Sequence, residues 1–280
     1  GKKKTGTLQM QSGKNLKKKG LSLKIKKTGQ TGRSRSGSEW IYGLNPVLEA
    51  IRAGRNIIGI FISSGRHDKV FEIKKEAADR KIPVKIADPI FFDSNFSKGH
   101  QGVAAEVTSK GYVELDELFE IPLKRKETPL FIILDCIEDP RNFGAILRVA
   151  DAAGIHGIVI QSHRSATLGY EVSKVSAGAV EYVPVAMVAN IKHAIYEMKK
   201  QGITVVGAEA GADKIVWELN FKVPLALVFG SEGKGIRMTV RKNCDVLVSL
   251  PMQGKINSLN VSVAAGIFAF EILRQRRLNN

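Results

Sequence analysis

Six short apolar runs, separated by stretches of helical periodicity, constrain how the C-terminal half of this chain can fold. The runs span residues 130–134, 157–160, 182–186, 203–206, 225–229 and 246–250, and each has the length of a buried strand. Helical stretches lie between them at 143–153, 171–178 and 190–200, and a closing helix is predicted over 260–276. Strands that alternate with helices favour a parallel sheet covered on both faces. The sequence therefore predicts a large α/β domain.

A smaller alternating unit precedes this domain. Apolar runs at 57–62, 83–86 and 103–107 predict strands, and residues 67–80 have the spacing of an amphipathic helix. Another helix is expected to begin at Asn45-Pro46, with Asn45 as the N-cap. Residues 108–128 are more polar. We therefore predict a basic arm at 1–38, a small α/β domain at 39–108, a linker at 109–128 and the larger domain at 129–280.

The first 38 residues are strongly basic. The whole chain of 280 residues has 43 Lys and Arg against 27 Asp and Glu, a formal net charge of +16. Residues 1–38 hold 10 Lys, 2 Arg and no acid, which is +12 of that total. An arm of this composition is expected to be disordered and to bind a polyphosphate, or less favourably an anionic membrane. The alternatives are an added solubilising tail and an import peptide, although a transit peptide favours Arg over Lys.

The sequence also disfavours several functions. Two cysteines support neither a disulfide framework nor a Cys-rich zinc site, and no apolar run approaches the roughly 20 residues of a membrane span. The nucleotide-binding patterns G-x-x-x-x-G-K-[ST] and G-x-G-x-x-G are missing, as are H-E-x-x-H and G-x-S-x-G. The five histidines are scattered without ligand spacing. We therefore predict no metal site and no membrane partner.

Three segments at predicted strand ends carry unusual polar residues. Asn142 and Arg148 follow the first strand of the large domain, Glu232 lies in a Gly-rich turn at 229–235, and Ser258 and Asn260 precede the closing helix. Simpler explanations exist for each: a helix cap, an ion pair, or a tight turn with a solvated carboxylate. The carboxyl ends of parallel strands are nevertheless where open α/β sheets bind ligands. We therefore expect the three segments to converge on one pocket.

Taken together, these segments resemble the motifs of the SPOUT class of RNA methyltransferases, and within it the TrmH family of ribose 2′-O-methyltransferases. The pattern N-x-G-x-x-x-R matches Asn142, Gly144 and Arg148. The pattern G-x-E-G-x-G matches residues 230–235, and P-M-x-G-x-x-x-S-L-N-V-S-x-A matches residues 251–264. Residues 42–50 also resemble the start of the family's small RNA-binding domain, which is related to ribosomal protein L30e.

The resemblance implies a fold, a cofactor and an assembly. The larger domain would hold a deep trefoil knot, an arrangement that is rare in proteins, and would bind S-adenosylmethionine. Gly230, Leu250 and Leu259 would line the pocket for the adenine and ribose, with Gly207 and Met252 nearby. The family works as a homodimer in which the closing helix is buried near the cofactor.

The resemblance also implies a reaction, in which a ribose 2′-hydroxyl of RNA attacks the sulfonium methyl group. The hydroxyl proton has to leave as the new bond forms. A guanidinium keeps its proton at neutral pH, so we expect Arg148 to hold a phosphate and stabilise alkoxide charge, and Glu232 to accept the proton. Asn142, Ser258 and Asn260 would fix the ribose and that carboxylate.

The subgroup that this chain resembles most methylates a guanosine of bacterial large-subunit rRNA, and it has mitochondrial relatives. Large-subunit rRNA is therefore the expected partner. The cytoplasm is the expected compartment, with the mitochondrial or plastid matrix as the alternative. Four other functions stay open: methylation of tRNA, methylation of another large-subunit rRNA nucleotide as in antibiotic-resistance methyltransferases, a non-catalytic role in ribosome assembly with the same fold, and a nucleotide-binding enzyme of the doubly wound type.

Overall fold

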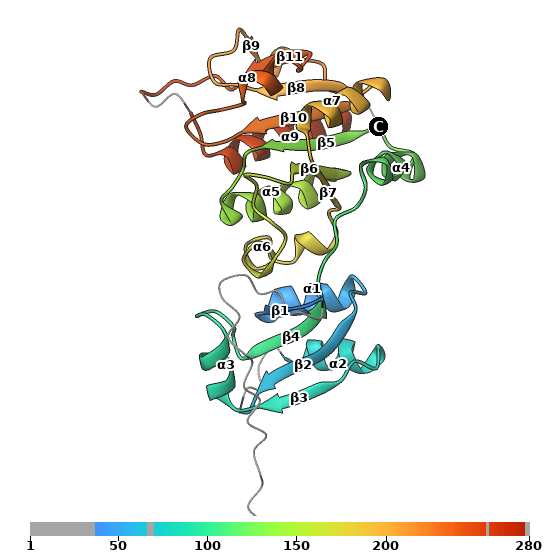
Figure 1. The fold of residues 1–280 in the computed structure, drawn as a ribbon, viewed down its shortest axis with the longest axis vertical. Helices are drawn as coiled ribbons and strands as arrows, with labels where there is room; N and C mark the ends of the chain where they lie inside the picture. Colours follow the sequence, from blue (N-terminus) through green and yellow to red (C-terminus); the bar gives the residue numbers. More distant parts are fainter. Residues whose placement is uncertain (1–36, 66–69, 256–257, 278–280) are drawn as a thin grey trace, which may run out of the picture.

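The computed structural model describes residues 37–65, 70–255 and 258–277, which form two α/β units that follow one another along the chain (Figure 1). All but the last two residues of the predicted basic arm lie outside the described residues. The smaller unit contains the elements β1 (Ser38–Tyr42), α1 (Leu44–Arg52), β2 (Ile57–Ser63), α2 (Phe71–Asp79), β3 (Val84–Ala87), α3 (Pro89–Asn95) and β4 (Val103–Thr108).

The larger unit begins with α4 (Leu115–Arg125). It continues with β5 (Leu130–Asp135), α5 (Pro140–Ala153), β6 (Gly157–Gln161), α6 (Tyr170–Val175), a 3-10 turn (Ala179–Glu181), β7 (Val185–Val188), α7 (Ile191–Lys200) and β8 (Thr204–Ala208). The last elements are β9 (Lys214–Ile215), a second 3-10 turn (Val216–Glu218), β10 (Leu225–Gly230), α8 (Met238–Arg241), β11 (Val246–Ser249) and α9 (Val261–Arg277).

The small unit is built on a four-stranded mixed sheet in the order β1-β4-β2-β3. Strand β4 is antiparallel to β1 and β2, whereas β3 is parallel to β2. Helices α1 and α2 bury Val47, Ile51 and Ile73 against one face of the sheet. On the other face, Phe92 of α3 packs in an aromatic cluster with Phe61. The small unit is thus an α/β domain, as predicted.

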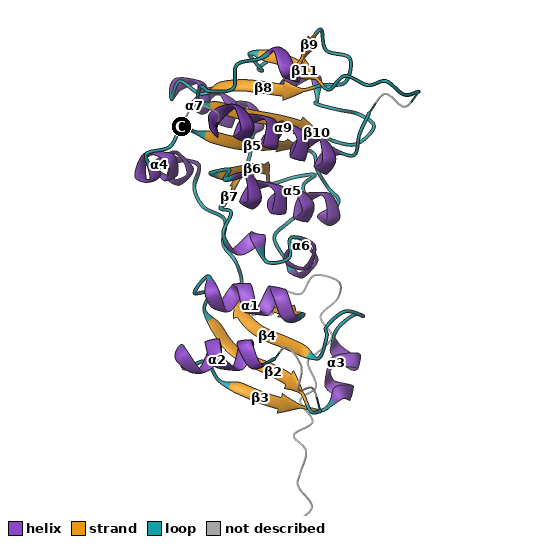
Figure 2. Ribbon diagram, turned by 180° about the vertical axis from the view of Figure 1, so that it is seen from behind, coloured by secondary structure: helices purple, strands orange, loops and turns teal. Residues whose placement is uncertain are grey.

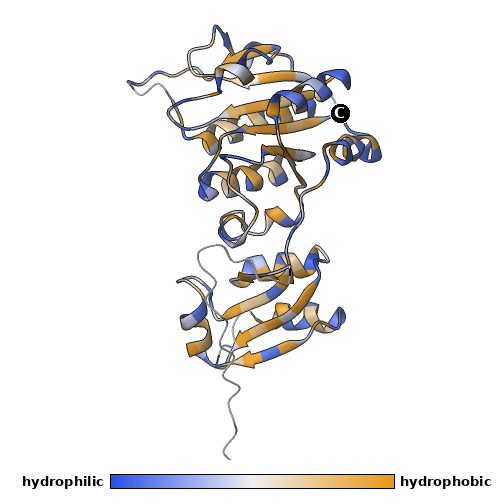
Figure 3. Cartoon of the chain, viewed as in Figure 1, coloured by the Kyte–Doolittle hydropathy of each residue, from blue (hydrophilic) through white to orange (hydrophobic). Residues whose placement is uncertain are grey.

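The large unit has a seven-stranded sheet in the order β7-β6-β5-β10-β8-β11-β9, and every neighbouring pair is parallel (Figures 1 and 2). Helices α5 and α9 pack against one face, and α4, α7 and α8 pack against the other. The central strands are almost wholly apolar (Figure 3), because a sheet covered on both faces buries every side chain. The predicted parallel sheet is therefore confirmed. The trefoil knot stays a prediction.

Local differences from the predicted elements have simple causes. Helix α1 begins two residues early, with Gly43 and not Asn45 as its N-cap, because Gly43 adopts a φ of 99° and the Gln101 side chain accepts from the Leu44 amide. The strand expected at 182–186 begins at Val185, because a 3-10 turn ends at Glu181 with Tyr182 as its C-cap and the chain reaches the sheet only after it. The segment predicted as a linker contains α4, whose Leu118 is buried beneath the large sheet.

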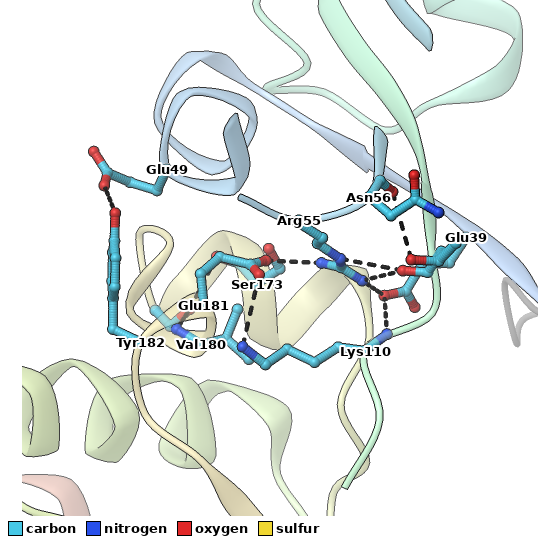
Figure 4. A network of polar contacts seen from close by, with 11 residues as sticks. Glu39, Glu49, Arg55, Asn56, Lys110, Ser173, Val180, Glu181 and Tyr182 are labelled. Atoms are coloured by element: carbon cyan, nitrogen blue, oxygen red, sulfur yellow. Dashed lines mark hydrogen bonds and ion pairs between the residues drawn. The ribbon is translucent and has the colours of Figure 1, made fainter. Parts of the chain in front are cut away.

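The two units make direct polar contact through a buried ionic network (Figure 4). The Arg55 guanidinium of the small unit donates to Glu39 of the same unit and, at 2.7 Å, to Glu181 of the large one. It also donates to the Thr108 carbonyl at 2.9 and 3.1 Å. The Arg55 and Glu181 side chains are only 8% and 2% exposed. Because a buried charge is costly without its partner, this network fixes how the two units meet.

Two further contacts extend this interface. The Tyr182 hydroxyl donates to Glu49 at 2.6 Å, and burial together with that carboxylate raises the pKa of Tyr182 to about 12. The rings of Tyr42 and Tyr170 stack with their centroids 3.4 Å apart. None of the helices in the described part of the chain has the length and apolar character that a membrane crossing needs.

Candidate active site

In the loop after β5, a residue other than Asn142 caps the helix that follows. Asp139 is the N-cap of α5, because its side chain accepts from the Arg141 amide, and Pro140 occupies the first helical position. Hydrogen bonds from Arg141 lower the pKa of the Asp139 carboxyl. Capping therefore does not explain Asn142, whose side chain is available for other contacts.

The Gly-rich turn after β10 brings Glu232 back over the end of its own strand. Ser231 and Gly235 form a β-bridge, so the residues between them make a tight loop. A Cβ on Gly230 would lie 2.0 Å from the carbonyl carbon of Gly235, which no side chain could tolerate. The close approach of strand and loop thus requires glycine at position 230. Glu232 stands at the exposed tip of this loop.

Asn260 has two roles at the start of α9. Its side-chain oxygen accepts from the Ser262 amide at 2.9 Å and from the Ser262 hydroxyl at 2.6 Å, which caps the helix. Its amide nitrogen donates to Asn142 at 2.9 Å and to Glu232 at 2.7 Å. Capping and site contact are therefore made by opposite ends of one amide group.

One residue from each of the three motifs contacts the other two. The Asn142 amide also donates to Glu232, at 3.0 Å, so Asn142, Glu232 and Asn260 form a closed set of hydrogen bonds that we call the amide–carboxylate triad. Residues 90 and 118 positions from Asn142 in the sequence meet it here. Both amides donate to the same oxygen of Glu232, Oε1. No hydrogen bond from the described residues reaches the other oxygen, Oε2.

A cavity of about 310 Å³, which we call the triad cavity, opens beside Asn142 and Glu232. It lies at the carboxyl ends of β5 and β10, where open α/β sheets bind ligands. Acidic and basic side chains both line it: Glu138 and Asp139 with Glu232, and Arg164, Lys234 and Arg237. The cavity can therefore hold a ligand that carries both signs of charge.

One wall of this cavity is fixed by a network that the motifs did not reveal. The Arg237 guanidinium donates to the fully buried Asp135 carboxylate at 2.7 Å, and its backbone amide donates to the same group at 2.8 Å. It also donates to Gln161 at 2.7 Å. The Asp135 carboxylate raises the pKa of Arg237. The sequence does contain one signal of this network: Asp135 is a charged residue at the end of a buried strand, and such a charge needs a partner.

Two of the five predicted catalytic residues lie outside the triad. Arg148 is exposed on α5, and Ser258 is exposed just before α9; neither makes a hydrogen bond or ion pair within the part of the chain that the structure describes. The acidic partner that would have explained Arg148 structurally is thus not found among these residues. Both side chains face solvent.

None of the five predicted cofactor residues lines the triad cavity. Gly230 ends β10, Leu250 packs against the core after β11, and Met252 and Leu259 are 37% and 40% exposed. Gly207 is buried in β8, where a Cβ would lie 2.7 Å from the Leu247 side chain, so only its backbone can face a ligand.

An additional carboxylate lies at the end of β8. The Oε2 atom of Glu209 is buried and has no hydrogen-bond partner among the described residues, and it lies 3.8 Å from where a Cβ on Gly235 would be. Among the same residues, no cluster of His, Cys, Asp and Glu is placed to hold a metal ion.

Comparison with known proteins identifies the family. The profile of the SpoU rRNA methylase family matches residues 129–270, which span the sheet and the whole triad. The chain belongs to the SpoU rRNA methylase family. A second profile, for the substrate-binding domain of RNA 2′-O ribose methyltransferases, matches residues 40–113, the small unit. Both units of this SpoU methylase thus have counterparts in RNA-modifying enzymes.

Individual relatives agree with this assignment. The Bacillus subtilis protein YacO, named as a TrmH family tRNA/rRNA methyltransferase, is 40% identical over 85% of this chain and 96% of its own length. The Pseudomonas aeruginosa 23S rRNA (guanosine-2′-O-)-methyltransferase RlmB is 41% identical over 85% of this chain and 98% of its own. The crystal structure of AviRb from Streptomyces viridochromogenes, a SpoU methyltransferase in complex with AdoMet, has a TM-score of 0.74 at 25% identity, over 86% and 92% of the two chains.

These findings decide between the classes of function. The SpoU methylase described here is an RNA 2′-O-methyltransferase by family, and the doubly wound nucleotide-binding alternative is set aside. The SPOUT-type fold and the resemblance to the TrmH family are confirmed.

Proposed function

We propose that this enzyme transfers a methyl group from S-adenosylmethionine to the 2′-hydroxyl of a guanosine in large-subunit rRNA. The observation that carries the proposal is the triad, in which two amides from separate motifs hold one oxygen of Glu232. A matching relative that is named for 23S rRNA guanosine supports this target over tRNA. Relatives named for both RNA classes keep tRNA as the second candidate.

Glu232 is the proposed proton acceptor. Its Oε1 is engaged by Asn142 and Asn260 at 3.0 and 2.7 Å, and its Oε2 takes no hydrogen bond from the described residues. The two amides therefore orient the carboxylate so that Oε2 points its lone pairs toward an incoming hydroxyl. A positioned general base typically contributes about 10²–10⁴-fold to a rate.

Arg148 is the proposed phosphate contact. Its guanidinium is exposed and has no acidic partner among the described residues. A free guanidinium binds phosphate oxygens through two parallel donors. Ser258, exposed before α9, would contact the same nucleotide.

The residues around the triad fit S-adenosylmethionine, which when bound supplies a methyl group on a sulfonium. The apolar side chains of Leu250, Met252 and Leu259 would contact the adenine. The unpaired Oε2 of Glu209 would accept from a hydroxyl or ammonium group of the cofactor. The bare backbone at Gly230 and Gly235 lets a ligand approach closely.

The remaining parts of the chain would bind RNA and a second subunit. We propose residues 39–108 as the RNA-binding domain and the arm at 1–38 as an additional phosphate contact. Helix α9 exposes about half of Val263 and Phe270 although its other face is core, which supports a homodimer through this helix. The bacterial relatives support the cytoplasm as the compartment.

The proposal is tested by methyl transfer to transcripts of large-subunit rRNA and of tRNA, with the modified nucleoside identified by mass spectrometry. We expect methyl incorporation into a guanosine of the large-subunit transcript. Exclusive modification of tRNA would replace the target and leave the chemistry in place.

The assignment of roles is tested with two variants of the same enzyme. Glu232→Gln should lower turnover by about 10²-fold or more while S-adenosylmethionine binding by calorimetry is unchanged. Arg148→Lys should mainly raise the KM for RNA, because lysine keeps the charge and loses the two-donor geometry. Near-normal turnover of Glu232→Gln together with an inactive Arg148→Lys would show the roles to be reversed.

A further inference from the structure

A second cavity, of about 250 Å³, adjoins the triad cavity. It lies at the carboxyl ends of β6 and β7, and Arg164 and Arg237 line both cavities. The two cavities are therefore immediate neighbours along the same edge of the parallel sheet. We call the second one the basic cavity.

The charge of the basic cavity differs from that of the triad cavity. His163, Arg164, Lys192 and Arg237 line it, and none of its lining residues is acidic. Asp135 compensates the charge of Arg237. No ion pair from the described residues reaches Arg164 or Lys192, so their two positive charges are left over. An uncompensated pair of cations in a hollow favours an anionic ligand.

The walls of the basic cavity are held in place by the fold. Arg237 is fixed by hydrogen bonds to Asp135 and Gln161, both at strand ends. The side chain of Asn190 accepts from the Lys192 amide and so fixes the first turn of α7. Arg164 adopts a φ of 53°, a left-handed conformation that is uncommon for a residue other than glycine. Arg164 lines both cavities and therefore lies between them.

We propose that the basic cavity binds a phosphodiester of the RNA strand next to the nucleotide that is methylated. The inference rests on the proposed function, because it places the target ribose in the triad cavity. A strand whose ribose lies there carries its next phosphate into the adjoining hollow. Arg164 and Lys192 supply the compensating charges, and Arg237 supplies a donor of fixed direction.

The test measures RNA affinity against salt concentration for the full-length enzyme. The probe is a single-stranded 12-nucleotide RNA of mixed sequence. Each phosphate contact contributes about 0.7 to the slope of log K against log salt for single strands. The cavity is proposed to hold one phosphodiester, so the double variant Arg164→Ala/Lys192→Ala should lower the slope by about 0.7 and weaken binding at least tenfold at low salt.

The matched control is Lys214→Ala, which removes one charge at β9, the opposite edge of the sheet from β7. It should leave RNA affinity within about twofold of wild type. S-adenosylmethionine affinity should be unchanged in all variants, and Arg164→Lys should keep most of the slope. A double variant with the slope and affinity of the Lys214→Ala control would overturn the proposal.

A second arm tests the position of the phosphate. An RNA that the wild-type enzyme methylates is made with a neutral methylphosphonate at one linkage on either side of the target. At one of these linkages, the neutral group should raise the KM of the wild-type enzyme about tenfold. The KM of the double variant should not rise further when the same linkage is made neutral. Additive losses at both linkages would overturn the proposal. Failure of wild type to methylate any RNA would instead refute the proposed function, and the binding arm would still decide on the cavity.

Discussion

A methyl group added at Gly230 tests whether the Gly-rich turn is the device that places Glu232. In the structure, a Cβ at position 230 would lie 2.0 Å from the carbonyl carbon of Gly235 and 2.2 Å from the amide nitrogen of Ile236. Cβ atoms essentially never approach another heavy atom closer than 3.0 Å, so the strand and the turn must separate by at least 1.0 Å. Both obstacles are backbone atoms, so no side-chain rotation relieves the clash. Because Glu232 lies between the two ends of the turn, it must move as well.

We expect Gly230→Ala to lower the single-turnover rate of methyl transfer by about 10²-fold, since a displacement of about 1 Å at a reacting group has this effect. Overpacking also costs about 1–3 kcal/mol of stability. The variant is therefore assayed at a temperature where circular dichroism shows it to be folded, and at saturating S-adenosylmethionine. Gly111→Ala is the control, because nothing lies within 4 Å of its added Cβ. A folded Gly230→Ala enzyme with the wild-type rate would show that the Gly-rich turn does not set the position of Glu232.

Three other predictions concern the interface, the triad and a buried histidine. Arg55→Met removes the 2.7 Å partner of the buried Glu181 carboxylate and leaves it only Lys110 at 3.7 Å, so the free energy of unfolding in urea should fall by up to about 3–5 kcal/mol. A loss no larger than that of Arg52→Met, at an exposed ion pair, would contradict this. Asn260→Asp keeps an oxygen that caps α9, but it replaces the amide that donates to Glu232 with a carboxylate oxygen. The melting temperature should therefore stay the same, while kcat falls at least tenfold. An unchanged kcat would count against the triad. Burial lowers the pKa of His156 in the folded protein, where its Nδ1 accepts from the Leu130 amide. As the pH falls, His156 is therefore protonated in the unfolded chain before it is protonated in the folded one. The stability that is present at neutral pH is then lost as pH falls below about 6.5. His156→Gln should flatten the unfolding free energy between pH 7.5 and 5, and a slope equal to that of wild type would show that another group is responsible.

The sequence predicts the large sheet well because its strands are continuous apolar runs. Strands β5 and β10 are buried on both faces, and such runs have no other place in a folded chain. Helix α4 was missed for the opposite reason. It contains Pro122, a residue that normally interrupts helices, and it buries little besides Leu118. Leu115 and Phe119, at helical spacing from Leu118, are only partly buried against the core of the large sheet.

The sequence predicted only part of the site, because some of its polar residues have two structural explanations. Sequence patterns could not decide whether Asn142 and Asn260 cap helices or face a ligand, because the same residue types do both. The structure shows that Asp139 replaces Asn142 as the cap, whereas Asn260 performs both roles. The contact between Arg237 and Asp135 joins residues 102 positions apart, and only the folded sheet brings them together.

The central claim is that the acceptor of the methyl group is a ribose 2′-hydroxyl held at the triad. It is tested most directly by replacing the target guanosine of a methylated rRNA fragment with 2′-deoxyguanosine, which removes that oxygen and keeps the base. We expect 2′-O-methylguanosine in the unmodified fragment and no methyl incorporation in the deoxy fragment. Continued methylation of the deoxy fragment, or a methyl group found on the base, would contradict it.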